Sequence, residues 1–299
     1  MVLVAVAGGA GGIGSAIADT LRLSPHHKLI IPTRKVSNTA QASDAFVTVN
    51  YGDTNSMVKV FDDNNVHTVI SAILVNDSVS SEVESNLVRA TNRDRTSKRF
   101  IASAWGIQYA DTYVFLRDNL DDAESRTTNL EWTRFTNGFF LDYYGPPSCK
   151  SYMRRVAWSI DMVNKKAGIP GKVNEPMTFT YSFDVAKFVV AALDLPKWNE
   201  LMYCYGEKTT WNEFLKQADE ARGKRPQCLF VLPKGEVTVL PSNEDVPDFS
   251  NRVLEGLMSF WGLDVLEGKF DIPTDKALDH VFPDINPLKN LEGLSNQAK

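Results

Sequence analysis

Short apolar runs alternate with amphipathic stretches along the first half of the chain. The apolar runs cover residues 2–7, 28–32, 45–50, 68–73, 99–103 and 130–136. Between them, apolar positions recur at helical spacing in residues 14–23, 56–64, 79–92 and 114–125. Such alternation is typical of strands and helices that are joined by right-handed crossovers. It predicts an α/β fold that is built on a doubly wound parallel sheet.

The pattern changes after Gly145-Pro146-Pro147, where Pro and Gly become more frequent and the alternation less regular. We therefore expect a first domain over residues 1–145 and a smaller second lobe over residues 146–299. Asp184 is predicted to cap a helix over residues 185–193. Residues 180–196 are expected to pack back on the first domain, so the second lobe is partly discontinuous. Further helices are predicted over residues 211–222, capped by Thr209 or Thr210, and over residues 250–262, before a polar C-terminal dozen.

A glycine-rich loop joins the first predicted strand to the first predicted helix. Gly8, Gly11 and Gly14 give the spacing GxxGxxG, and Gly12 and Ile13 complete the loop. Glycine permits a tight turn and a close approach of backbone to a pyrophosphate, and a helix N-terminus adds unpaired N–H groups. The loop therefore predicts a Rossmann-type dinucleotide site. The alternative is a tight glycine turn that binds no ligand.

The second predicted strand ends in basic residues. A site that is specific for NAD carries an acidic residue here, which binds the ribose 2′-hydroxyl. This chain has Arg34 at that position, followed by Lys35. A guanidinium can hold a 2′-phosphate through paired, charge-assisted hydrogen bonds. The expected cofactor is therefore NADP(H), and the alternative is a pair of solvated surface charges.

The composition and net charge of the chain limit the classes of partner that it is expected to bind. The formal net charge of −5 disfavours a nucleic-acid partner, because phosphate binding needs a basic face. No window is apolar enough to span a membrane, and glycines interrupt the N-terminal apolar run, which indicates a strand and not a signal peptide. Cys149, Cys204 and Cys228 are far apart, and the four histidines lack metal-binding spacing. We expect a cytoplasmic protein with reduced thiols, no metal site and a small-molecule substrate.

A series of motifs follows in a fixed order along the chain. They are the glycine loop, Thr33-Arg34, Val69-Ile70-Ser71-Ala72, RFIASAWG at residues 99–106, Trp132-Thr133, Asn137-Gly138-Phe139-Phe140 and Asp184-Val185-Ala186. In this order they resemble the NmrA-like and isoflavone-reductase-like family of atypical short-chain dehydrogenases. Residues 193–198 and 220–224 are similar to its fungal branch, whose members commonly act in natural-product pathways.

This resemblance covers most of the chain and carries several implications. It implies a Rossmann domain, a small C-terminal substrate lobe and NADP(H) as cofactor. The cofactor-binding residues that it implies beyond the glycine loop are Ser71, Ala72, Ser103, Asn137, Gly138 and Phe139.

The chain departs from the family at the reductase lysine, which lies on the helix after the fifth strand. Residues 112–119 contain no lysine, and Arg117 stands nearest to the expected place. The family's glutamate in the strand-end motif is Ala104 here. Tyr113 and Arg117 are four apart and share a helix face, like the Tyr-x-x-x-Lys pair of typical short-chain dehydrogenases. Tyr113 is thus a candidate proton donor beside a cation, unless the two form an ordinary surface pair.

Two further candidates lie near the end of the fifth strand. Tyr109 follows in the loop and is a second candidate acid. Ser103 is placed to polarise a carbonyl, and the alternative is a serine that satisfies backbone groups.

Aromatic residues gather in sequence after the sixth strand. The predicted substrate-binding residues are Trp105, Phe140, Tyr143 and Tyr144. Such side chains favour a bulky, apolar or aromatic substrate, unless they fill the core between lobes.

Three functions fit these features. The first is an NADPH-dependent reductase that acts on a ketone, imine or conjugated double bond of a bulky aromatic or alkaloid-like secondary metabolite. The second is a redox-coupled cyclase or isomerase that uses bound NADP(H). The third is a redox-sensing regulator that binds NADP(H) without turnover.

Overall fold

The chain forms two compact units in the computed structural model. The structure describes residues 1–35, 46–108, 130–222, 229–232, 240, 242 and 251–296. The first unit contains residues 1–136 and 185–202, and the second contains residues 137–184 and 203–299. Within the described residues, no helix combines the length and the hydropathy that crossing a bilayer requires.

The first unit is organised around a seven-stranded sheet. Its strands are β1 (Val2–Ala7), β2 (His27–Thr33), β3 (Phe46–Thr48), β4 (Thr68–Ser71), β5 (Arg99–Ile101), β6 (Glu131–Thr136) and β11 (Leu201–Tyr203). Their order is β11-β6-β5-β4-β1-β2-β3, and β1 to β6 pair in parallel. The predicted doubly wound α/β fold is therefore confirmed. The chain direction across the sheet reverses between β1 and β4, which is where sheets of this kind bind ligands.

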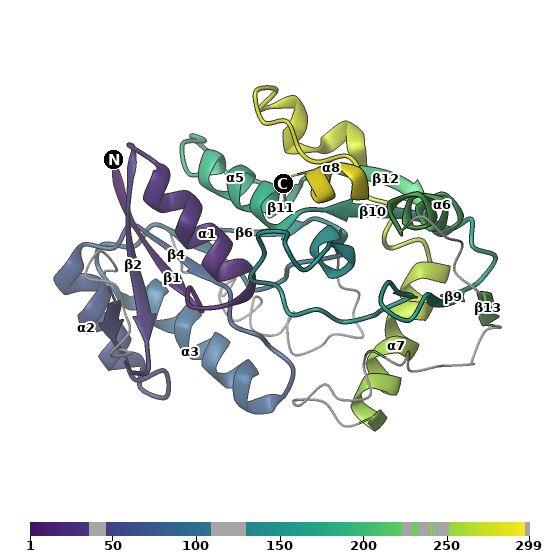
Figure 1. Cartoon of the computed structure of the whole chain (residues 1–299). Helices are drawn as coiled ribbons and strands as arrows, with labels where there is room; N and C mark the ends of the chain where they lie inside the picture. Colours follow the sequence, from purple (N-terminus) through teal and green to yellow (C-terminus); the bar gives the residue numbers. More distant parts are fainter. Residues whose placement is uncertain are drawn as a thin grey trace. The chain divides into compact units, whose positions relative to one another are not determined.

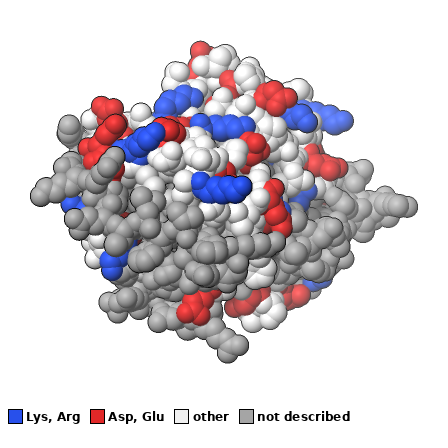
Figure 2. All heavy atoms as spheres, turned by 90° about the vertical axis from the view of Figure 1, so that its right-hand side faces the viewer, with Lys and Arg blue, Asp and Glu red and all other residues white. Residues whose placement is uncertain are grey.

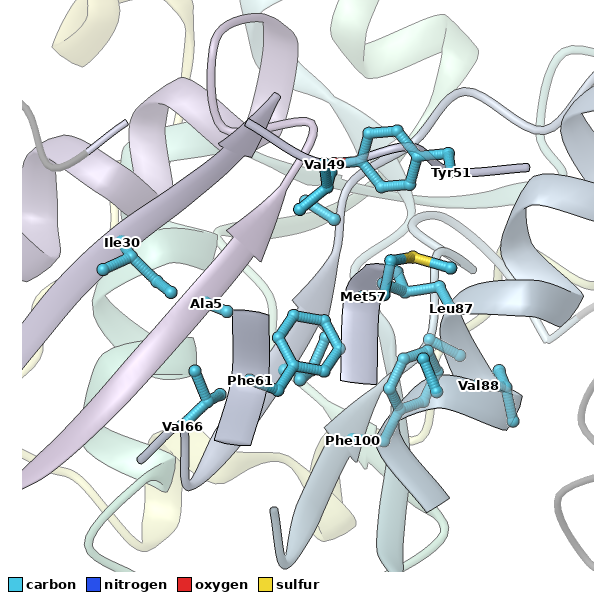
Figure 3. Packing of buried hydrophobic residues seen from close by; sticks show 14 residues of the cluster. Ala5, Ile30, Val49, Tyr51, Met57, Phe61, Val66, Leu87, Val88 and Phe100 are labelled. Atoms are coloured by element: carbon cyan, nitrogen blue, oxygen red, sulfur yellow. The ribbon is translucent and has the colours of Figure 1, made fainter. Parts of the chain in front are cut away.

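Helices cover both faces of this sheet (Figure 1). They are α1 (Gly12–Leu23), α2 (Thr54–Asn64) and α3 (Ser78–Arg93). Buried side chains of α2 and α3, among them Phe61 and Leu87, pack against Ala5 and Phe100 of the strands, as Figure 3 shows. Side chains alternate along a strand, so Val4 and Val6 face the opposite side, which α1 covers.

The second unit contains two small sheets. One has the order β12-β10-β7, and the other has the order β13-β9-β8. The strands are β7 (Phe139–Phe140), β8 (Ile160–Asp161), β9 (Lys166–Pro170), β10 (Pro176–Thr180), β12 (Glu207–Thr210) and β13 (Leu229–Leu232). The helices are α5 (Ser182–Ala192), α6 (Trp211–Arg222), α7 (Asn251–Leu266) and α8 (Leu291–Asn296). Helix α5 begins in the second unit and continues into the first from residue 185. Short 3-10 helices form at Leu141–Tyr144, Thr274–Lys276 and Leu278–His280.

An aromatic cluster forms the core of the second unit. Phe139 is at its centre, with ring centroids of Phe270 at 4.5 Å, Trp261 at 5.0 Å and Trp211 at 5.9 Å. Phe179 lies 6.2 Å away on β10. Offset and edge-on contacts of this kind add to the free energy of burying the rings. The cluster joins residues from β7, β10, α6 and α7, and it therefore holds the unit together.

Charged residues on the side of the molecule drawn in Figure 2 are of both signs. Lys and Arg alternate with Asp and Glu across the described surface of that side. Neither sign forms an unbroken patch among the residues described there.

The helix near residue 184 begins differently from the prediction. Asp184 was expected as its N-cap, but α5 begins at Ser182 and Asp184 lies inside it. The Asp184 carboxylate instead accepts a hydrogen bond from the N–H of Leu288 at 2.8 Å. Asp142 takes the capping role, since it accepts from the N–H of Ser182 at 2.8 Å and from its hydroxyl at 2.6 Å. The predicted cap was wrong because the true partner lies far away in sequence.

Two other helix predictions have different outcomes. The helix over residues 211–222 is confirmed, and Thr210 caps it by accepting from the N–H of Glu213 at 3.2 Å. The last dozen residues were predicted as a polar terminus, but α8 forms there and buries Leu291 and Leu294. The helix predicted over residues 114–125 lies outside the described residues.

Candidate dinucleotide site at the glycine loop

Two glycines of the loop are required by its packing. Gly8 has a φ of +81°, which is a left-handed conformation that favours glycine. A Cβ atom on Gly8 would lie 2.5 Å from the carbonyl oxygen of Ala72, just after β4. A Cβ atom on Gly14 would lie 2.3 Å from the carbonyl oxygen of Gly8. These two residues therefore bring the loop, the start of α1 and the end of β4 into direct contact.

Gly11 serves a different purpose. It is the N-cap residue of α1 and has an extended backbone, with a φ of −161°. A Cβ atom there would meet nothing within 4 Å, so packing within the chain does not require glycine. The helix has no side-chain cap and no acidic residue in its first turn. The first-turn N–H groups and the positive end of the helix dipole therefore remain available to an anion.

Arg34 lies at the tip of β2, close to this loop. Arg34 and Lys35 are both exposed, and the hydroxyl of Thr33 donates to the carbonyl of Lys35 at 3.2 Å. Tyr51 connects Arg34 to the loop. Burial raises the pKa of Tyr51, the Arg34 guanidinium lowers it, Glu84 raises it and a backbone hydrogen bond from Gly8 lowers it. Arg34 and Gly8 thus both act on one phenolic oxygen, which places a positive charge beside the glycine loop.

A buried carboxylate joins the ends of β4 and β5. Glu84 of α3 accepts a hydrogen bond from the hydroxyl of Ser71 and another from the N–H of Ser103, the latter at 3.1 Å. Burial raises the pKa of Glu84 from 4.5 to about 7, although the bonds from Ser71 and Ser103 oppose this rise. The indole N–H of Trp105 donates to the carbonyl of Ser71 at 3.1 Å. Hydrogen bonds with Glu84 and Trp105 therefore fix the end of β4, and Glu84 also binds the segment that follows β5.

Sequence reasoning missed Tyr51 and Glu84. Glu84 lies at helical spacing from Leu87, Val88 and Thr91, and all four are buried. This spacing was the available signal, because it places an acidic residue on the apolar face of α3. No comparable signal exists for Tyr51, whose partners come from other parts of the sheet.

Ser103 is held by the backbone at the end of β5. Its hydroxyl donates to the carbonyl of Ile73 at 2.6 Å, and its only hydroxyl hydrogen is engaged in that bond. The geometry thus ties the loop after β5 to the loop after β4.

The remaining predicted cofactor residues belong to the second unit. Asn137 is fully buried, and Gly138 has a φ of +70°. A Cβ atom on Gly138 would lie 2.2 Å from the carbonyl oxygen of Thr178, so glycine is needed for packing there. Phe139 lies at the centre of the aromatic cluster.

The predicted substrate residues are divided between the units. Trp105 belongs to the first unit, where its ring stacks on Phe135 at 5.9 Å. Phe140 and Tyr144 are buried in the second unit, and Tyr143 is partly exposed. Tyr109, Tyr113 and Arg117, the predicted catalytic residues, lie outside the described residues.

Comparisons with known proteins agree with this geometry. Residues 4–97 match the NAD dependent epimerase/dehydratase family. The chain is 33% identical over 232 residues to oxidoreductase BOA1 of Botryotinia fuckeliana, an alignment that covers 75% of this chain and 77% of that protein. It is 26% identical over 321 residues to oxidoreductase swnN of Metarhizium robertsii, with 95% and 94% covered.

Solved structures show the same fold. The leucoanthocyanidin reductase–NADPH complex from Vitis vinifera superposes with a TM-score of 0.73 at 15% identity and covers 99% of each chain. The complex of AtPrR2 with NADP+ and (+)pinoresinol gives 0.71 at 18% identity and covers 99% of this chain and 98% of that one. With these relatives, and with the glycine loop at the reversal point of the sheet, the chain belongs to the NmrA-like and isoflavone-reductase-like family of NAD(P)-dependent oxidoreductases.

Proposed function

We propose that the protein is an NADPH-dependent reductase whose first unit binds the dinucleotide at the glycine loop. The observation that carries the proposal is the start of α1, where Gly11 leaves open space beside an uncapped helix end that has no acidic residue. Such an end binds the pyrophosphate of a dinucleotide. A helix end that served packing alone would not need glycine at that position.

Arg34 supports the choice of the phosphorylated cofactor. It is exposed at the tip of β2 and close enough to Tyr51 to lower the pKa of its hydroxyl, while burial, the larger effect, raises it. The 2′-phosphate of NADP(H) carries the charge that a guanidinium binds best, and Lys35 adds a second cation. An NAD-specific site would have an acidic residue in this place.

The strand ends of β4 and β5 are proposed to face the nicotinamide half of the cofactor. Ligands in such sheets gather outside the carboxyl ends of the strands. The residues at these ends are Ser71, Ala72 and Ser103. Glu84 accepts hydrogen bonds from Ser71 and Ser103, and the indole of Trp105 donates to the carbonyl of Ser71. When bound, the nicotinamide supplies hydride to an electrophilic carbon of the substrate. The chain then has to deliver a proton to the oxygen, nitrogen or carbon that receives the electron pair.

Tyr113 and Tyr109 are the proposed proton donors, with Arg117 as the cation that favours loss of the proton from Tyr113. Arginine itself remains charged near neutral pH and so cannot be the donor. Its proposed role is to polarise the substrate and hold the tyrosine hydroxyl.

We propose a bulky aromatic or alkaloid-like secondary metabolite as the substrate, reduced at a ketone, imine or conjugated double bond. Solved proteins of this fold are described as acting on, or bound to, pinoresinol, leucoanthocyanidin and isoflavone. The second unit is rich in aromatic side chains, and those of Tyr143, Tyr152 and Phe260 have exposed surface. Rings of this kind provide a large apolar contact with an aromatic ligand.

Cofactor titration followed by turnover tests the proposal. NADPH fluorescence should report saturable binding that is tighter than the binding of NADH. A panel of cyclic imines, enones and aryl ketones should then support NADPH oxidation, with a product that has gained two hydrogens. Saturable binding with no turnover on the panel would favour the regulator, and a product with a new ring would favour the redox-coupled cyclase. Failure to bind either dinucleotide would refute the proposal.

A further inference from the structure

Glu84 is a buried carboxyl group that the proposed reaction does not use. It lies on α3 with 2% of its surface exposed. One carboxylate oxygen contacts the hydroxyl of Ser71 at the end of β4, and the other accepts the N–H of Ser103 after β5 at 3.1 Å. Ser103 in turn donates to the carbonyl of Ile73 at 2.6 Å. One side chain therefore joins the two strand ends that border the dinucleotide site.

The surroundings of Glu84 offer no cation as a direct partner. Among the residues that the structure describes, its polar contacts are Ser71 on β4 and Ser103 after β5. The ionisable group that faces it is Tyr51, which follows β3, and the positive charge of Arg34 at the tip of β2 lowers the pKa of that same hydroxyl. On α3 itself, Glu82 is exposed and pairs with Arg89. A buried carboxyl without a cation favours its neutral form.

The neighbours of Glu84 also connect it to the glycine loop. The charge of Glu84 raises the pKa of Tyr51, and a backbone hydrogen bond from Gly8 lowers it. Gly8 packs against the carbonyl of Ala72, which follows Ser71 directly. The carboxyl is therefore part of the same small assembly as the loop that is proposed to hold the phosphates.

We propose that Glu84 is a proton-linked positioning residue: its carboxyl joins the ends of β4 and β5, and binding of the anionic dinucleotide is coupled to uptake of a proton by this carboxyl. This inference rests on the proposed function. Negative charge on Glu84 repels the phosphates across a medium of low dielectric, whereas the neutral form does not. Binding and protonation then favour each other, because a coupling free energy acts equally in both directions. Glu84 is buried, so it acts through Ser71 and Ser103 and does not touch the ligand.

Calorimetry of NADPH binding tests the coupling without any turnover. Titrations at one pH, in two buffers of different ionisation enthalpy, give the number of protons taken up per dinucleotide bound. Near pH 7 the wild-type protein should take up a substantial fraction of one proton. A shift of about one pKa unit on binding, from about 7 to about 8, should raise its Kd by about fivefold between pH 6 and pH 8.

Glu84→Gln is the informative variant. It keeps the shape and one of the two acceptor oxygens, and it presents an N–H donor where the protonated carboxyl presents its O–H. It does not titrate, so its Kd should vary less with pH and its proton uptake should fall. The 2′-phosphate of the ligand titrates in both proteins and cancels in the difference between them. Glu82→Gln, on the same helix but exposed and paired with Arg89, is the matched control and should behave as wild type.

The outcomes separate the inference from the proposed function. If wild type binds NADPH with no proton uptake and an unchanged Kd from pH 6 to pH 8, the inference is wrong and the reductase proposal stands. Equal pH dependence in wild type and Glu84→Gln would also overturn it. Absence of NADPH binding at every pH would contradict both the reductase proposal and the inference about Glu84. If Glu84→Gln does not fold, the same titration of wild type with NADH decides the matter, because NADH lacks the 2′-phosphate and proton uptake on binding it cannot come from that group.

Discussion

The phenolic hydroxyl of Tyr51 donates a hydrogen bond to the main-chain carbonyl of Pro32 at 2.9 Å. The bond ties the segment after β3 to the tip of β2, directly before Thr33 and Arg34. Gly8 and Arg34 act on the same hydroxyl from the glycine loop and from the strand tip. Tyr51 therefore holds the proposed phosphate-binding cation in a defined place relative to the loop.

Removing this hydroxyl should loosen the strand tip. Tyr51→Phe leaves the carbonyl of Pro32 without its donor, and a lost hydrogen bond at a buried group lowers the free energy of unfolding by about 1–2 kcal/mol. NADPH should bind a few-fold more weakly, since Arg34 loses its support. Urea unfolding and fluorescence titration measure the two effects. Unchanged stability would show that Tyr51 contributes through its ring alone.

The choice between NADPH and NADH should depend on Arg34. In Arg34→Ala the 2′-phosphate loses charge-assisted hydrogen bonds that contribute about 1.5–3 kcal/mol, so the Kd for NADPH should rise by about 10- to 100-fold. NADH has no such phosphate, and its Kd should change by less than about twofold. Lys28→Ala is the control, because Lys28 is exposed near the opposite end of β2. An equal loss for both dinucleotides would mean that Arg34 does not read the phosphate.

Two glycines of one loop should respond differently to the same substitution. Gly14→Ala forces a Cβ atom to 2.3 Å from the carbonyl oxygen of Gly8, so the free energy of unfolding should fall by about 3 kcal/mol or more. Gly11→Ala meets no atom within 4 Å and has an extended backbone, so stability should stay within about 1 kcal/mol. Dinucleotide binding should nevertheless fall sharply in Gly11→Ala, because the methyl group occupies the space where the pyrophosphate approaches. A Gly11→Ala protein with wild-type affinity would place the phosphates elsewhere.

Much of the first unit could be predicted from local patterns. Patterns among neighbouring residues indicate several of its elements. Apolar runs indicate the strands β1, β2 and β4, helical spacing of apolar residues indicates α1, and the positions of the glycines indicate the loop between β1 and α1. Right-handed crossovers between these elements predict a doubly wound parallel sheet, whereas the order of its strands comes from the structure. Arg34 could be assigned a role because its place relative to β2 is fixed by the same local pattern.

What sequence reasoning missed depends on contacts between distant segments. Asp142 accepts from Ser182, 40 residues away, and so replaces Asp184 as the partner of the α5 N-terminus. Tyr51 reaches Pro32 across 19 residues, which no local propensity indicates. Leu291 and Leu294 become buried only because another part of the second unit supplies a surface for α8. Side-chain partners of this kind are fixed by tertiary packing and not by the local pattern.

The core of the second unit should be sensitive at Phe139. Its ring contacts Phe270, Trp261, Trp211, Trp158 and Phe179, so Phe139→Ala opens a cavity at the centre of the cluster. Such a change lowers the free energy of unfolding by about 3–5 kcal/mol. The near-ultraviolet circular dichroism of the tryptophans should weaken as well. Phe260→Ala is the control on α7, because Phe260 is 51% exposed and should cost little. Equal effects of the two substitutions would contradict the central position of Phe139.

The charge of Glu84 should also make stability depend on pH. Burial raises its pKa from 4.5 to about 7, so the folded state binds the proton more tightly than the unfolded state does. The contribution of Glu84 protonation to the free energy of unfolding is therefore complete below about pH 4.5. It falls as the pH rises towards 7 and is absent at higher pH. A difference of about 2.5 pKa units corresponds to about 3 kcal/mol. Glu84→Gln does not titrate, so its free energy of unfolding relative to wild type should rise by about that amount from pH 4.5 to pH 7.5.

Urea unfolding of both proteins at several pH values measures this difference directly. Groups that titrate equally in the two proteins cancel, and Glu82→Gln should show no such trend because Glu82 is exposed. A flat difference across this range would mean that Glu84 is ionised in the folded protein at all these pH values. The bonds from Ser71 and Ser103 would then outweigh the effect of burial, and the carboxyl would join the strand ends as a permanent anion.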